Sequence, residues 1–94
     1  MKRYLIASPA LQEWIAHLPP AIKKKIRAAL EEILENPELG KALKEELLGL
    51  RSYRVGQIRI LYKILTPGIE LVLIGPRKTI YQKAILVFKR LAEE

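Results

Sequence analysis

The chain has 94 residues, half of them apolar, and a formal net charge of +7. This length fits one domain, and the clear apolar periodicity excludes a disordered chain. No apolar run reaches the roughly 18 residues of a membrane-spanning helix. The absence of cysteine excludes disulfides and thiolate metal sites and fits a reducing compartment. We therefore expect a single cytoplasmic domain over residues 1–94, with no membrane partner.

The first third of the chain predicts a short strand followed by two helices. The strand is expected over residues 2–8. Ser8 and Pro9 then form a helix start, because serine caps free N–H groups and proline is tolerated at the first helical position. The apolar face of this first helix carries Leu11, Trp14, Ile15 and Leu18.

Pro19 and Pro20 separate the first helix from a second one, which ends at Asn36-Pro37. Because the link is so short, we expect the two helices to form an antiparallel hairpin. Residues 38–49 follow as a connector with some helical tendency. The apolar stripe of the second helix carries Ile22, Ile26, Leu30, Ile33 and Leu34.

The second half of the chain predicts three strands, over residues 51–55, 57–65 and 69–75. Val55-Gly56-Gln57 and Thr66-Pro67-Gly68 supply the turns between them. The middle strand alternates, so Arg59 and Lys63 share one face. The opposite face carries Ile58, Ile60, Tyr62 and Ile64.

A last helix is expected after the third strand. Thr79 with Gln82 matches a capping box, in which each side chain bonds a free backbone N–H of the helix start. Its apolar face carries Ile80, Ala84, Val87, Phe88 and Leu91.

The predicted class is α+β, an antiparallel sheet with an N-terminal helical hairpin and a C-terminal helix. We expect the helices to cover one face of the sheet. The other face, with Arg59 and Lys63, is then the candidate working surface.

The positive charge is concentrated in the second half of the chain. Residues 47–92 contain nine lysines and arginines but one acid, Glu70, whereas residues 31–46 contain six glutamates and two lysines. Such polarity is typical of a protein that binds nucleic acid. The alternative is a generic soluble basic domain.

Three arginines of this basic half are expected to lie close together. In an antiparallel meander, Arg59 faces both neighbouring strands, Arg54 ends one of them and Arg77 follows the other. Clustered guanidinium groups repel one another unless an anion lies between them, and phosphate suits arginine well. The alternative is three solvated arginines. Tyr81, four residues after Arg77, could stack on a base, exchange a proton or simply pack in the core.

The residue inventory limits the chemistry. There is no aspartate and only one histidine, so a Ser-His-Asp triad cannot form. The basic half lacks the carboxylate cluster of a two-metal nuclease. We expect no metal and no cofactor, and any reaction must use arginine, lysine, tyrosine or an isolated glutamate.

Two segments, "LLGLRSYRVGQIRILYKIL" and "IELVLIGPRKTIYQKA", resemble the RelE/ParE superfamily of type II toxin–antitoxin toxins. The resemblance covers nearly the whole chain. It implies a small RelE-like, microbial RNase-like fold. For the RelE branch it also implies ribosome-dependent cleavage of mRNA, without metal, by attack of a 2′-OH on its own 3′ phosphate.

Carried over by position, the resemblance implies four catalytic residues. Tyr81 is the candidate base, and Arg77 is the candidate acid or leaving-group stabiliser. Arg54 and Arg59 would neutralise the transition state. Two positions differ from the family pattern: Gly56 stands where RelE-type toxins often carry a second lysine, and Pro76 where relatives have a polar residue.

Two other functions stay open. The ParE branch shares the fold and poisons DNA gyrase, and a non-catalytic RNA-binding relative would cut nothing. The expected partners are a cognate antitoxin, with which a heterotetramer can form, and mRNA on the ribosome. Other cations are candidate RNA or ribosome contacts, or solvated side chains: Lys23, Lys24, Lys25, Arg27, Arg51, Lys63, Lys78 and Lys83.

Overall fold

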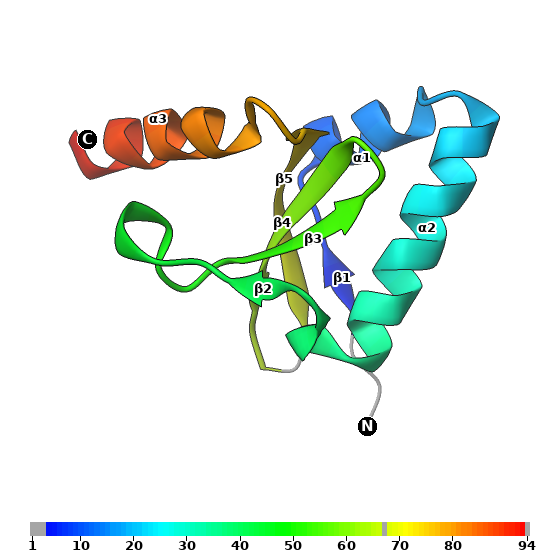
Figure 1. Cartoon of the computed structure of the whole chain (residues 1–94), viewed down its shortest axis with the longest axis horizontal. Coiled ribbons are helices and arrows are strands. Elements are labelled where there is room, and N and C mark those ends of the chain that lie inside the picture. The colour runs from blue at the N-terminus through cyan, green and yellow to red at the C-terminus, as the bar shows by residue number, and fades with distance from the viewer. Residues whose placement is uncertain (1–3, 67, 94) are drawn as a thin grey trace.

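The computed structural model of the chain describes residues 4–66 and 68–93. A five-stranded sheet in the order β1-β5-β4-β3-β2 lies between the N-terminal helices and the C-terminal helix (Figure 1). The elements are β1 (Leu5–Ile6), α1 (Pro9–Ala16), α2 (Pro20–Glu35), η1 (Pro37–Leu39), β2 (Lys41–Ala42), η2 (Glu45–Leu47), β3 (Arg51–Val55), β4 (Ile58–Ile64), β5 (Ile69–Pro76) and α3 (Ile80–Glu93), where η marks a 3₁₀ turn.

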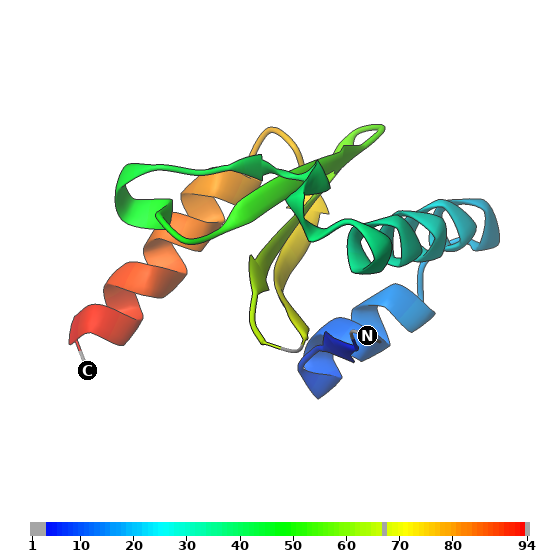
Figure 2. The same cartoon turned by 90° about the horizontal axis from the view of Figure 1, so that it is seen from below.

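α1 and α2 begin where the sequence predicts and α2 ends as predicted, whereas α1 ends at Ala16, so Leu18 lies beyond the helix. The Ser8 hydroxyl accepts a hydrogen bond from the Leu11 N–H at 3.2 Å and so caps α1. The two helices run back on each other as the predicted hairpin (Figure 2), and they cross at an oblique angle (Figure 1). The apolar stripes predicted for the two helices include residues that the fold leaves partly exposed. Trp14 of α1 is 39% exposed and Ile22 of α2 is 38% exposed.

The first strand corrects the prediction of an antiparallel sheet. β1 pairs with β5 in parallel, Leu5 opposite Ile69, so the sheet is mixed. The chain has to cross from β1 through both helices and β2–β4 before β5 lies beside it, and this crossover allows parallel pairing. The predicted strand is also too long: β1 has two residues, and residues 2 and 3 lie outside the described part of the chain.

The connector contains a strand that the sequence analysis missed. β2 pairs with β3 at the edge of the sheet, with Lys41 opposite Ser52. Buried Tyr62 fixes the start of this segment: its hydroxyl donates to the Pro37 carbonyl at 2.6 Å and accepts from the Gly40 N–H at 2.8 Å. A Cβ on Gly40 would lie 2.6 Å from that same hydroxyl oxygen, so the contact requires glycine.

The sheet separates two hydrophobic cores. β4 alternates as predicted: Ile60 and Tyr62 face α1 and α2, whereas Leu61 faces the other way, and all three are fully buried. A bulge in the β4–β5 register lets both Val72 and Leu73 face the side of Leu61.

The second core corrects the prediction that helices cover one face only. α3 packs on the face opposite α1 and α2, as both Figure 1 and Figure 2 show. Its contacts there are made by Ile80, Ala84 and Phe88, whereas Val87, predicted for the apolar face, is 37% exposed. Leu91 lies outside the described side chains. The sheet face that carries Arg59 is thus partly covered by α3.

Within the described residues, no helix combines the length and the apolar character needed to cross a membrane.

Candidate functional site

The sheet register brings the three predicted arginines to one end of the hairpin. Arg54 and Arg59 are direct partners across β3 and β4, and Arg59 is also opposite Gly75 on β5. The Arg77 N–H donates to the Gln57 carbonyl at 2.8 Å, which holds the chain beyond β5 against the same turn. The backbone positions of the predicted cluster are therefore as expected.

Ser52 connects two of the predicted site residues, and the sequence analysis did not single it out. Its hydroxyl accepts a hydrogen bond from an Arg59 guanidinium N–H at 3.2 Å. It also shares a hydrogen bond of 2.8 Å with the Tyr81 hydroxyl, in which either oxygen can be the donor. One signal was available: strand alternation places Ser52 on the same face as Arg54.

Tyr81 lies in the first turn of α3, where it packs in the core and also contacts Ser52 and Arg59. Its ring packs, half-buried, against the core between α3 and the sheet. The Arg59 guanidinium carbon lies 5.7 Å from the centre of the ring, within the range of a cation–π interaction. Its hydroxyl is held by Ser52. We call Ser52, Arg59 and Tyr81 the tyrosine cluster.

The other two arginines lie at the margin of the tyrosine cluster. Arg54 is exposed, and its Nε donates to the Gly56 carbonyl at 3.0 Å, which folds the side chain back over the turn. Arg77 is half-buried in the turn between β5 and α3. The structure thus joins Arg59 and Tyr81 through side chains and places Arg54 and Arg77 near them through the backbone.

The remaining predicted contacts lie on more than one surface. Lys63, Lys78 and Lys83 are exposed, and all three belong to the part of the chain from β4 to α3. The cations of α2 lie on the opposite side of the sheet, as Figure 1 shows, so one flat RNA surface cannot include both sets. That second set comprises Lys23, Lys24, Lys25 and Arg27.

Arg51 differs from the other predicted contacts because its guanidinium is already engaged. Its NH1 donates to the Gly40 carbonyl at 2.6 Å and to the Glu38 carbonyl at 3.3 Å. These bonds hold the connector that contains β2 against β3, which gives Arg51 a structural role in the fold.

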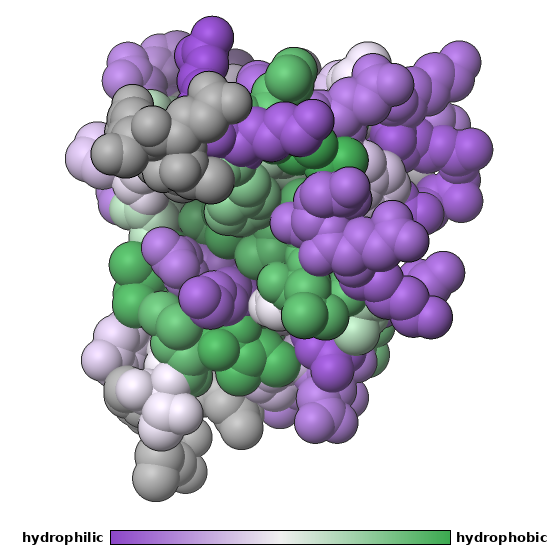
Figure 3. All heavy atoms as spheres, turned by 90° about the vertical axis from the view of Figure 1, so that its left-hand side faces the viewer, coloured by the Kyte–Doolittle hydropathy of each residue, from purple (hydrophilic) through white to green (hydrophobic). Residues whose placement is uncertain are grey.

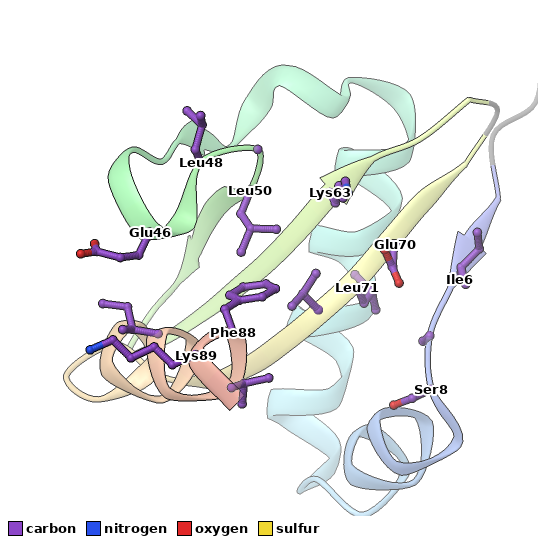
Figure 4. A pocket seen from close by; sticks show the side chains of 15 residues that line it. Ile6, Ser8, Glu46, Leu48, Leu50, Lys63, Glu70, Leu71, Phe88 and Lys89 are labelled. Carbon is purple, nitrogen blue, oxygen red and sulfur yellow. The ribbon is translucent and has the colours of Figure 1, made fainter. Parts of the chain in front are cut away.

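A groove of about 670 Å³ opens between α3, the sheet and the η2 segment, and no residue of the tyrosine cluster is among those that line it. Its lining is mainly apolar, and Phe88 and Leu50 approach each other from opposite walls (Figure 4). A space-filling view from the side of α3 shows this apolar surface surrounded by hydrophilic side chains (Figure 3). At its edge, Leu48 is 79% exposed. The charged residues of its lining are Glu46, Lys63, Glu70 and Lys89.

The described residues contain no group of three histidine, cysteine, aspartate or glutamate side chains placed to hold a metal ion.

Comparison with known proteins gives one family and one fold. Residues 4–81 match the family model for the ParE toxin of the type II toxin–antitoxin system parDE. The solved toxin–antitoxin complex RelBE2 from Mycobacterium tuberculosis matches with a TM-score of 0.70 and 25% identity, over 82% of this chain and 100% of that one. No curated protein sequence matches.

Two structures from E. coli match at lower identity and therefore show the fold alone. A mutant of the toxin RelE in the free state has a TM-score of 0.72 at 13% identity, over 95% of this chain and 98% of that one. The same mutant in complex with an antitoxin RelBc peptide has a TM-score of 0.64 at 18% identity, over 89% and 95% of the two chains.

The family match extends from β1 into the first turn of α3 and includes every residue of the tyrosine cluster. The predicted RelE-like α+β fold is confirmed by the structural matches. The chain is therefore a member of the ParE toxin family, and thus a type II toxin–antitoxin toxin of the RelE/ParE superfamily.

Proposed function

We propose that this toxin is a ribosome-dependent mRNA endonuclease that cleaves RNA without a metal ion. The observation that carries the proposal is the tyrosine cluster. A phenol, a guanidinium and a buried hydroxyl are hydrogen-bonded at one end of the sheet, and Arg54 and Arg77 flank them. Cations suit an RNA phosphate, and a phenol is a group that can exchange a proton with the ribose.

The reaction is the internal transfer of one phosphodiester. The 2′ oxygen attacks the adjacent phosphorus, the bond from phosphorus to the 5′ oxygen breaks, and a 2′,3′-cyclic phosphate remains. Tyr81 accepts the 2′ proton. Arg59 and Arg54 balance the negative charge of the transition state. Arg77 stabilises the 5′ oxygen as it leaves, because a guanidinium stays charged in proteins and donates several hydrogen bonds.

The test is cleavage of a defined mRNA in a reconstituted translation system. Wild-type protein should cut the mRNA on the ribosome, and both Tyr81→Phe and Arg77→Ala should lower the rate by about 100-fold or more. Tyr4→Phe and Arg90→Ala are matched controls, since Tyr4 and Arg90 are exposed and belong neither to the tyrosine cluster nor to its flanking arginines. Full activity of Arg59→Ala and Arg77→Ala would reject the site assignment.

A second candidate function is inhibition of DNA gyrase. The observation in its favour is that the matching family model is that of the ParE toxin. Its test is a gyrase supercoiling assay run beside the cleavage assay. If the mRNA stays uncut and supercoiling is inhibited, the protein is a gyrase inhibitor and not an endonuclease. If neither activity is seen and the protein binds RNA, the protein is a non-catalytic RNA-binding relative of these toxins.

We also propose that a cognate antitoxin occupies the groove beside α3. The solved RelBE2 and RelE–RelBc structures are complexes of a toxin with an antitoxin. The groove here offers an apolar floor, and a second copy of this chain is disfavoured because two molecules of net charge +7 repel. The occupant that fits is an amphipathic antitoxin segment with an apolar ridge and flanking acidic residues.

A further inference from the structure

Among the described residues, Ser52 is polar and yet buried, with 3% of its surface exposed. It lies on β3 opposite Leu61, between the sheet and α3. A hydroxyl in such a place lowers stability unless it is hydrogen-bonded, and both its partners belong to the proposed catalytic set. Its position therefore calls for an explanation beyond packing.

The donor order follows from the chemistry of the three groups. A guanidinium can only donate, so the Ser52 oxygen must accept the bond from Arg59. A serine hydroxyl has one proton and two acceptor positions, so its proton stays free to point at the Tyr81 oxygen, 2.8 Å away. When Tyr81 carries its own proton, either oxygen can be the donor in this contact.

We propose that Ser52 is a positioning residue that holds Tyr81 ready to accept a proton. This inference rests on the proposed endonuclease function. In the form of Tyr81 that accepts the 2′ proton, Ser52 donates to the Tyr81 oxygen while Arg59 donates to Ser52. A positive charge thus acts on Tyr81 through a chain of two hydrogen bonds, and such chains strengthen their members.

The proton count of the cleavage step is then complete. Tyr81 takes the 2′ proton as the bond from the 2′ oxygen to phosphorus forms. The bond from phosphorus to the 5′ oxygen breaks, and the 5′ oxygen takes a proton from water. Ser52 keeps its own proton throughout. Ser52 touches no reacting atom.

The kinetic test compares Ser52→Ala, which removes the hydroxyl, with Ser52→Thr, which keeps it. Cleavage of mRNA by ribosomes with bound toxin should show a fall in kcat of about 10- to 100-fold for Ser52→Ala, with KM within about twofold. Ser52→Thr should restore most of kcat. A loss seen only in KM, or equal losses in both variants, would overturn the proposal.

A double-mutant cycle separates positioning from a purely structural effect. If Ser52 acts through Tyr81, Ser52→Ala should cause no further loss of rate in a Tyr81→Phe background. An effect on folding would instead appear in both backgrounds. Additive losses would therefore reject the proposal, and thermal unfolding of each variant shows whether it is folded at the assay temperature.

A readout on the free protein keeps this inference distinct from the endonuclease proposal. With ¹³C-labelled tyrosine, Ser52→Ala should shift the Cζ signal of Tyr81, and Ser52→Thr should return it towards the wild-type position. The Tyr53 and Tyr62 signals should stay in place. If wild-type protein does not cut mRNA, the endonuclease function fails, while an unmoved Tyr81 signal is what rejects the link between Ser52 and Tyr81.

Discussion

At the scale of single residues, Tyr53 and Tyr62, like Tyr81, have hydroxyls that connect separate elements. The Tyr53 hydroxyl donates to the Glu32 carboxylate of α2 at 2.7 Å, and this bond raises the pKa of Tyr53 above its ordinary 10.0. Burial raises the pKa of Tyr62, although the Gly40 N–H and the charge of Arg51 oppose the shift. Both groups are thus held in their neutral form by the folded state.

The sign of the pH effect follows from the raised pKa values. The folded protein binds these protons more tightly than the unfolded chain, so their stabilisation is complete below pH 10.0 and is lost as pH rises through the folded-state pKa. We expect the free energy of unfolding to fall above about pH 10.

Tyr53→Phe tests this residue-scale prediction. It should cost at most about 1 kcal/mol at pH 8, because the bond to Glu32 is exposed to solvent. It should also make the decline above pH 10.0 less steep, leaving the part due to Tyr62. Urea unfolding at a series of pH values measures both effects. Tyr4→Phe is the control, and an equally steep decline in Tyr53→Phe would contradict the assignment.

At the scale of elements, the β3–β4 hairpin aligns the site. Gly56 has a φ of +61° and follows Val55 directly, so it is the first central residue of a two-residue turn. A positive φ at that position alone is typical of a type II′ turn, which suits the twist of a hairpin and favours glycine. This turn sets Arg54 opposite Arg59 and offers the Gly56 carbonyl to the Arg54 side chain.

Gly56→Ala should therefore destabilise the protein by about 1 kcal/mol. The cause is backbone strain alone, because a Cβ at Gly56 would meet no atom within 4 Å. Gly56→Asn is the matched variant and should recover part of the loss, since asparagine is, after glycine, among the residues most common in the primed turn types. Thermal or urea unfolding measures the difference, and an alanine variant as stable as wild type would show that the turn changes its type.

Some predictions were wrong because they depend on how the elements pair and pack. β2 has two exposed residues, too few for any alternation, so only its pairing with β3 identifies it. Trp14 and Ile22 fit an apolar stripe, but their helices cross obliquely (Figure 1) and both side chains stay partly exposed. Periodicity predicts a face, whereas the angle between packed elements decides how much of it is covered.

At the scale of the whole molecule, the groove beside α3 is the apolar surface that a partner can cover. Leu48 and Leu86 are both exposed leucines, at 79% and 64%, but only Leu48 lines the groove. This pair allows a matched test of where the antitoxin binds, with little risk to the fold because neither side chain is buried.

We expect Leu48→Glu to weaken binding of the cognate antitoxin by about tenfold or more, since a carboxylate would be buried in an apolar contact. Leu86→Glu should bind like wild type. The antitoxin can be taken from a small reading frame beside the gene, and titration calorimetry gives both affinities. Equal affinities for the two variants would place the antitoxin elsewhere on the toxin.

The sequence by itself determined the class of fold, the starts of the three helices, the hairpin turn and the backbone proximity of Arg54, Arg59 and Arg77. Capping, turn chemistry and strand alternation are local rules, so they can be read without the tertiary structure. Only the tertiary structure decided the parallel pairing of β1, the place of α3 on the second face and the contacts of Ser52. These depend on which distant elements meet. The tyrosine cluster joins β3, β4 and α3, and no spacing along the chain encodes that meeting.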